Sequence, residues 1–116
     1  MTNSIGEFED AELFLVTGSN TTAQHPLIGS RIINAVERGA ELLLIDPREI
    51  PLARFASLQL RQNIGTDVAV LNGMMNIIIE EDLWDREYVE NRTEGFEQLR
   101  ALVSRYSPRI VEKISG

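Results

Sequence analysis

The sequence predicts a small three-layer α/β domain in which helices flank a parallel sheet. Two short apolar runs, residues 13–16 and 42–45, have the length and composition of strands buried on both faces, as parallel strands are. Between them, apolar residues recur at three- and four-residue spacing over 27–36, which is typical of an amphipathic helix. Two such strands joined through one helix almost always form a right-handed parallel crossover, so the pattern predicts a Rossmann-like fold.

Turn-forming residues mark the boundaries of these elements. A polar loop is expected over residues 19–25, after the first strand. Pro26 suits the first turn of the following helix because its missing N–H has no helical partner there, and Gly39 suits a left-handed cap after a helix that ends near Arg38. Alternating apolar and polar residues over 56–60 predict a third strand at the edge of the sheet.

The C-terminal half has the pattern of successive helices. Thr66 is expected to cap a long helix that closes at residues 80–82, and its buried side is expected to carry Val68, Leu71, Met74, Met75 and Ile78. Two further helices are expected over 84–91 and 93–105, and Pro108 is expected to start a last short helix.

Composition excludes several classes of function. The chain has 116 residues, 11 Lys and Arg against 18 Asp and Glu, a net charge of −7, and no cysteine. Thiolate metal sites and thiol nucleophiles are therefore absent, and the acidic balance argues against binding to nucleic acid. The apolar stretch at residues 77–79, the candidate considered for a membrane span, is interrupted at once by Glu80, which argues against membrane insertion. The acidic first ten residues do not resemble a secretory signal peptide, so we expect a cytoplasmic protein.

Catalysis by this chain alone has little support. His25 is the only imidazole that a nucleophilic triad could use. Its position before Pro26 suits a structural role instead, in which the residue is held extended and fixes the loop or accepts hydrogen bonds at the helix start. The acidic residues around Glu80 have the pattern of a solvated helix surface.

A nucleotide-binding edge is better supported, because three turn segments are expected at the carboxyl ends of successive strands, where open α/β sheets bind ligands. Residues 17–22 offer a glycine backbone, hydroxyls and an amide to anionic or ribosyl oxygen atoms, although they are not a G-x-G-x-x-G fingerprint and an ordinary turn has the same composition. Asp46 either accepts ribose hydroxyls or caps a turn. Asp67, in the segment 65–67, either accepts the N–H groups of a purine such as guanine or belongs to a helix cap.

Taken in order along the chain, these segments resemble a known family. The third domain of molybdopterin-dependent oxidoreductases of the dimethyl sulfoxide reductase superfamily is similar over nearly the whole chain, and formate dehydrogenase catalytic (alpha) subunits are the nearest match within it. The matching stretches are Gly18-Ser19-Asn20-Thr21-Thr22, His25-Pro26, Asn34-Ala35, Ile45-Asp46-Pro47-Arg48, Gly65-Thr66-Asp67, Leu71-Asn72-Gly73, Ile78-Ile79-Glu80-Glu81 and Arg92-Thr93-Glu94-Gly95-Phe96.

The resemblance implies that the chain binds one molybdopterin guanine dinucleotide and positions it, with residues 11–82 as the nucleotide-binding core and 83–116 as a helical extension. Residues 17–24 would line the diphosphate and ribose, 45–49 the nucleoside, and 65–67 the guanine or ribose edge, with Asp67 on guanine and Asp46 on ribose. The implied cofactor-binding residues are Thr17, Gly18, Ser19, Asn20, Thr21, Thr22, Ala23, Gln24, Ile45, Asp46, Pro47, Arg48, Glu49, Gly65, Thr66 and Asp67.

The chain also departs from the family pattern. It has no cysteine or selenocysteine to bind the metal, no cysteine cluster for an iron–sulfur centre and no His-Arg catalytic pair. We therefore expect a piece of a larger catalytic subunit, whose other domains hold molybdenum or tungsten and any iron–sulfur cluster, with electron-transfer subunits as possible partners. The expected parent reaction is the oxidation of formate to carbon dioxide. The alternatives are the equivalent domain of a nitrate reductase-like enzyme and a stand-alone nucleotide-binding or interaction module.

Overall fold

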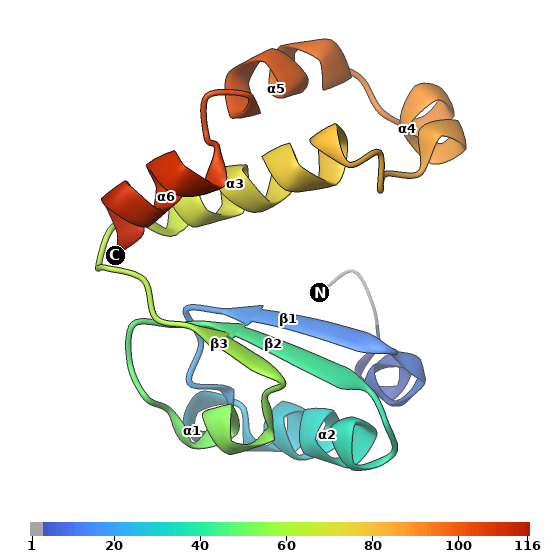
Figure 1. The fold of residues 1–116 in the computed structure, drawn as a ribbon. Coiled ribbons are helices and arrows are strands. Elements are labelled where there is room, and N and C mark those ends of the chain that lie inside the picture. The colour runs from blue at the N-terminus through green and yellow to red at the C-terminus, as the bar shows by residue number, and fades with distance from the viewer. Residues whose placement is uncertain (1–3) are drawn as a thin grey trace. The chain divides into compact units, whose positions relative to one another are not determined.

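The computed structural model describes residues 4–116 and divides them after Arg61 into two compact units. The first unit holds the sheet and the second, Gln62–Gly116, holds only helices (Figure 1). The long helix that follows the sheet therefore groups with the C-terminal helices in the second unit. The division that the resemblance implies, a nucleotide-binding core over 11–82 and a helical extension over 83–116, stays a prediction. The α/β class, with a three-stranded parallel sheet, helices and a helical C-terminal part, is confirmed.

The sheet has the strand order β1-β2-β3, and all its pairs are parallel. Its strands are β1 (Leu13–Thr17), β2 (Glu41–Ile45) and β3 (Leu58–Leu60). Phe14 pairs with Leu42, and Leu43 pairs with Leu58. The third strand is shorter than the predicted 56–60, and it lies at the sheet edge as expected.

Helices cover one face of this sheet (Figure 1). Helix α2 (Pro26–Glu37) starts at Pro26 as predicted, and Gly39 follows it at φ +111°. The short helices of this unit are η1 (Ile5–Asp10), α1 (Thr21–Gln24) and η2 (Pro51–Phe55). The core cluster joins β1, β2, α2 and η2, and its buried members are Phe14, Ile32, Ala35, Leu42, Leu44, Ile50 and Leu52.

The expectation that the first strand is buried on both faces is wrong. Side chains of a strand alternate between the two faces, and in β1 only Phe14 is buried. Leu13 and Leu15, on the other face, are 56% and 45% exposed. An unbroken apolar run predicts burial on both faces, but the helices of the first unit cover only the face that carries Phe14.

The second unit consists of α3 (Asp67–Glu80), α4 (Arg86–Arg92), α5 (Phe96–Val103) and α6 (Pro108–Ser115). Helices α5 and α6 pack on α3. The approach of α6 is close, because a Cβ atom on Gly73 would lie 2.6 Å from Cγ2 of Val111. The backbone N–H of Asn63 donates to the carbonyl of Ser115 at 2.7 Å and ties the start of the unit to its end.

The buried side of α3 differs from the predicted one. Val68 is 67% exposed and Ile78 is 40% exposed. The buried positions of this helix are Ala69, Val70, Asn72, Gly73 and Asn76. The helix is apolar almost all round, so its period does not select a face, and Gly73 lies where α6 approaches. Among residues 4–116, no helix is long and apolar enough to span a lipid bilayer.

Candidate functional site

The turn after β1 lies beside the end of β2. Gly18 follows β1 with φ +60°, a conformation that favours glycine, and its N–H donates to the carbonyl of Ile45 at 3.0 Å. A Cβ atom at Gly18 would meet no other atom within 4 Å, so the backbone faces open space. Thr17 ends the strand as an exposed residue. The first two predicted segments are therefore brought together at the carboxyl edge of the sheet.

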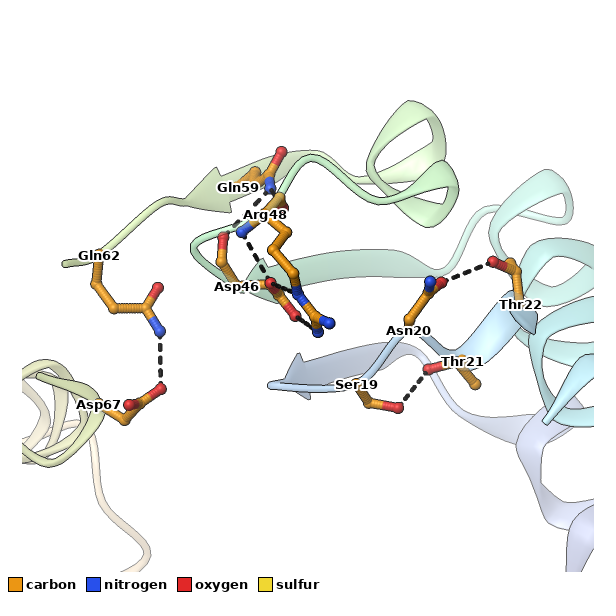
Figure 2. A network of polar contacts seen from close by, with 9 residues as sticks. All are labelled: Ser19, Asn20, Thr21, Thr22, Asp46, Arg48, Gln59, Gln62 and Asp67. Carbon is orange, nitrogen blue, oxygen red and sulfur yellow. Dashed lines mark hydrogen bonds and ion pairs between the residues drawn. The ribbon is translucent and has the colours of Figure 1, made fainter. Parts of the chain in front are cut away.

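Hydroxyl and amide groups cluster in the chain after Gly18 (Figure 2). The hydroxyls of Ser19 and Thr21 lie 3.1 Å apart within hydrogen-bond distance, and the Thr22 hydroxyl donates to Oδ1 of Asn20 at 3.3 Å. The predicted polar loop is wrong in one respect, because α1 forms a single helical turn there. A four-residue helix has no period that the sequence can reveal. Its last two residues, Ala23 and Gln24, are exposed.

Asp46 and Arg48 form a closed ion pair directly after β2 (Figure 2). Oδ1 of Asp46 accepts from the backbone N–H and from Nε of Arg48, both at 2.9 Å, and Oδ2 accepts from Nη2 at 2.8 Å. The Asp46 side chain is fully buried, whereas the Arg48 side chain is 58% exposed. The hydrogen bonds from Arg48 hold the pKa of the Asp46 carboxyl below its ordinary value.

Gln59 of β3 braces this turn. Its amide Nε2 donates to the carbonyl of Arg48 at 3.0 Å and to that of Asp46 at 3.5 Å. Sequence reasoning missed Gln59, although it is the polar residue between two leucines in the alternating strand pattern. The remaining predicted residues of this segment are Ile45, which is buried, Pro47, which is half-buried, and Glu49, which is exposed.

The third predicted segment belongs to the second unit. Gly65 has φ +84°, and Thr66 precedes α3 at the predicted cap position. The Thr66 hydroxyl does not cap the helix, because it donates to the carbonyl of Asn63 at 2.6 Å. Oδ1 of Asp67, the first residue of α3, accepts from Nε2 of Gln62 at 2.8 Å. Gln62 is buried, and its Oε1 has no hydrogen-bond partner among the described residues.

His25 takes a backbone role. Its N–H donates to the carbonyl of Thr21, and its own carbonyl accepts from the N–H of Gly29 at the start of α2. Its side chain makes no capping hydrogen bond to that helix. Of the two structural roles expected for this residue, acceptance of a hydrogen bond at the helix start is the one that the structure shows.

The groups at the carboxyl edge of the sheet fit a nucleotide. Gly18 leaves the backbone open, the Ser, Thr and Asn side chains of residues 19–22 supply neutral donors and acceptors, and Arg48 supplies an exposed cation with unused N–H groups. This donor set suits phosphate and ribose oxygen atoms. Within residues 4–116, no group of three or more acidic or imidazole side chains is placed to hold a metal ion.

Comparisons with known proteins identify the family of the chain. The family profile described as molybdopterin oxidoreductase matches residues 1–103. The F420-dependent formate dehydrogenase 1 subunit alpha of Methanococcus maripaludis is 45% identical over the whole chain, and formate dehydrogenase H of Escherichia coli is 41% identical over the whole chain. The chain covers 17% and 16% of their lengths, respectively.

A solved structure shows the same fold. The acetylene hydratase from Pelobacter acetylenicus superposes with a TM-score of 0.86 and 37% sequence identity. The match covers 94% of this chain and 15% of that one. The chain thus spans about a sixth of the length of the relatives it matches. It belongs to the molybdopterin oxidoreductase family.

Proposed function

We propose that this chain binds the guanosine diphosphate end of one molybdopterin guanine dinucleotide and positions that cofactor for a larger oxidoreductase. The observation that carries the proposal is the joining of the two turns after β1 and β2 by the Gly18 to Ile45 hydrogen bond, in a chain that belongs to this family. Open α/β sheets bind ligands at this edge.

Different segments of the first unit suit different parts of the cofactor. The hydroxyls and amides of residues 19–22 suit the diphosphate and ribose, with Thr17, Gly18, Ala23 and Gln24 as neighbouring backbone. Residues 45–49 suit the nucleoside. In the second unit, Asp67 would accept the paired N–H groups of guanine through its two carboxylate oxygens, of which Oδ1 also accepts from Gln62, with Gly65 and Thr66 beside it.

The chain's own contribution is binding and orientation. When bound, the cofactor supplies a dithiolene ligand to molybdenum or tungsten, at which the two-electron chemistry takes place. The metal ligands, any iron–sulfur cluster and electron-transfer partners would belong to other parts of the parent protein, because this chain has no cysteine. We expect the isolated chain to be inactive with formate.

The proposed parent reaction is the oxidation of formate to carbon dioxide. It rests on the 45% and 41% identity to two proteins named as formate dehydrogenases. The family by itself does not decide the reaction, because a structural relative is named as a hydratase. A nitrate reductase-like parent is the alternative, and an assay of the full-length parent with formate and with nitrate separates the two.

Calorimetric titration of the chain with GDP, ADP and NAD tests the cofactor proposal. We expect GDP to bind more tightly than ADP and NAD, because only guanine presents paired N–H donors to a carboxylate. Asp67→Asn should reduce this preference, because the amide offers one acceptor in place of the carboxylate's two. Equal affinity for the three ligands, or an Asp67→Asn variant with an unchanged preference, would contradict the assignment of guanine to Asp67. Absence of any nucleotide binding would contradict the proposed function itself.

A further inference from the structure

We infer that Asp46 is a positioning residue that fixes the guanidinium of Arg48 as the phosphate contact of the site. The inference rests on the proposed function and deepens it. It assigns Asp46 a different role from the ribose contact that the resemblance implies. It also assigns Arg48 to the diphosphate, in place of the nucleoside contact that the resemblance implies for residues 45–49. Three properties of the pair carry it: burial, hydrogen-bond geometry and place in the fold.

The two side chains of the pair differ in exposure to solvent. Asp46 has 0% of its side chain exposed, so a ribose hydroxyl has no open path to its carboxylate in this conformation. Both carboxylate oxygens are already occupied by three N–H groups of Arg48. Because no part of the Asp46 side chain is exposed, a ribose hydroxyl could reach it only after the surrounding groups moved and these hydrogen bonds broke. A buried carboxylate that loses its cation is strongly unfavourable.

Arg48 is held in place from three sides. Its backbone N–H, its Nε and its Nη2 all donate to the Asp46 carboxylate, and its carbonyl accepts from the Gln59 amide. The long flexible side chain is therefore fixed before any ligand binds, which lowers the entropy that binding would otherwise cost.

The fixed guanidinium keeps unused donors. A guanidinium has five N–H groups in a rigid fork, and the contacts to Asp46 use one on Nε and one on Nη2. The side chain is 58% exposed, so its remaining donors can reach a ligand. Arginine is well suited to phosphate recognition because its planar fork can donate two parallel hydrogen bonds.

The neighbourhood of Arg48 matches an anionic group. The Gly18 to Ile45 hydrogen bond sets the hydroxyl-bearing turn after β1 beside the turn that holds Asp46 and Arg48. In Figure 2 the guanidinium ends on the side of Asp46 that faces Ser19 and Asn20. A phosphate bound there would meet one cation and several neutral donors. The buried carboxylate has both of its oxygens engaged by Arg48, which limits its repulsion of the anion.

A comparison of GDP with guanosine tests the inference, since the two ligands differ only in the diphosphate. Affinities of the 116-residue chain and its variants are measured by calorimetry, with folding checked by circular dichroism. We expect Arg48→Gln to weaken GDP binding about ten-fold or more and to leave guanosine binding unchanged, because a charge-assisted hydrogen bond is lost. Arg54→Gln is the matched control, because Arg54 is an exposed arginine of the same unit for which no ion pair is seen among the described residues; it should change neither affinity.

A double-mutant cycle separates positioning from a purely structural role. Asp46→Asn should weaken GDP binding and spare guanosine, and in an Arg48→Gln background it should have no further effect on GDP. If Asp46→Asn weakens guanosine as much as GDP, Asp46 contacts the nucleoside and the inference is overturned, while the proposed function stands. Additive effects of the two substitutions on GDP would also overturn it. If the parent chain binds neither GDP nor guanosine, the proposed function fails and the inference falls with it.

Discussion

At the scale of single residues, the chemistry of the site depends on a buried carboxylate that is neutralised by its neighbour two positions along. Asp46 alone would be costly to bury as an ion. Arg48 offsets that cost with three hydrogen bonds, and more than half of its side chain remains exposed to solvent. The pair therefore anchors the end of β2 and presents a cation at the same time.

This pair predicts a pH dependence of stability. The pKa of Asp46 is lowered in the folded chain, so the folded state binds fewer protons than the unfolded state near that pH. The contribution of the ionised Asp46 to the free energy of unfolding is complete above the pKa of the unfolded chain, about 3.9. It is lost as the pH falls through the lower pKa of the folded chain. The free energy of unfolding, measured in urea, should therefore differ between the parent chain and Asp46→Asn by a constant amount from about pH 8 to 5, and by less below about pH 4.

The control for this prediction is Asp46→Asn in an Arg48→Gln background. Without the guanidinium, most of the lowering of the Asp46 pKa is removed. The free energies of unfolding of Arg48→Gln and of the double variant should therefore differ by an amount that hardly depends on pH. A difference between the parent chain and Asp46→Asn that grows as the pH falls would contradict this role of the pair.

The backbone conformation of Gly18 leads to a second prediction at this scale. Because its φ is +60° and no other atom lies within 4 Å of the position that a Cβ would take, only backbone strain opposes a larger residue. Gly18→Ala should lower the free energy of unfolding by about 1 kcal/mol, and Gly18→Asn by less, because Asn tolerates the left-handed conformation. Thermal or urea unfolding measures this. Gly6→Ala is the control, since Gly6 has no positive φ and its Cβ would make an ordinary contact. Equal losses for Ala and Asn would argue against strain as the cause.

At the scale of elements, helix α3 shows what periodicity can and cannot predict. Its start after Thr66 and its end at Glu80 follow from the sequence. Its buried face does not, because apolar residues surround the helix and the approach of α6 at Gly73 decides which side is buried. A glycine in mid-helix is unfavourable by propensity, and its close contact with α6 is the physical reason that it is tolerated here.

The α3 to α6 contact can be tested directly. Gly73→Ala should lower the free energy of unfolding by about 1–3 kcal/mol, because its Cβ would overlap with the Val111 side chain. Val111→Ala removes the overlapping methyl groups, so the double variant should lose less stability than the sum of the two single variants. Additive losses in urea unfolding would show that the two positions are not in contact.

The strands and short turns mark another limit of sequence patterns. The two apolar runs and the helix between them predicted the crossover correctly, because both runs have the length of strands and the segment between them has a clear helical period. The one-turn helix α1 and the brace provided by Gln59 were missed. Both arise from contacts between residues of different segments or from a single turn, which leave no periodic pattern.

At the scale of the whole molecule, the sheet carries an apolar patch on the face opposite its core. The patch consists of exposed side chains of both edge strands, Leu13, Leu15, Leu58 and Leu60. Exposed apolar patches of this kind favour association. The 116-residue chain should therefore self-associate in sedimentation experiments as its concentration rises.

A pair of variants tests this. Leu15→Thr keeps the propensity for a strand but removes apolar surface from the patch, so it should shift the chain toward monomer. Leu27→Gln changes an exposed leucine on α2 outside the patch and should leave association unchanged. A parent chain that sediments as a monomer at every concentration, or a Leu27→Gln effect equal to that of Leu15→Thr, would count against the patch.

The family and the fold class could be predicted from the sequence because motifs and burial patterns recur along the whole chain. Assignment of roles within the site needs more. The ion pair between Asp46 and Arg48 depends on the local turn and on the Gln59 brace from β3. The Asp-Pro-Arg motif alone reveals neither the burial of Asp46 nor its pairing with Arg48. The position of residues 65–67 relative to the sheet edge stays a prediction, since they belong to the second unit.

A nuclear magnetic resonance titration of the isotope-labelled chain with GDP shows residue by residue where the nucleotide binds. If the proposed site is correct, chemical-shift changes concentrate in residues 17–24, 45–49 and 65–67 and saturate together with one affinity. Shift changes that instead concentrate around the apolar hollow of the second unit, which Trp84 and Phe96 help to line, would contradict it.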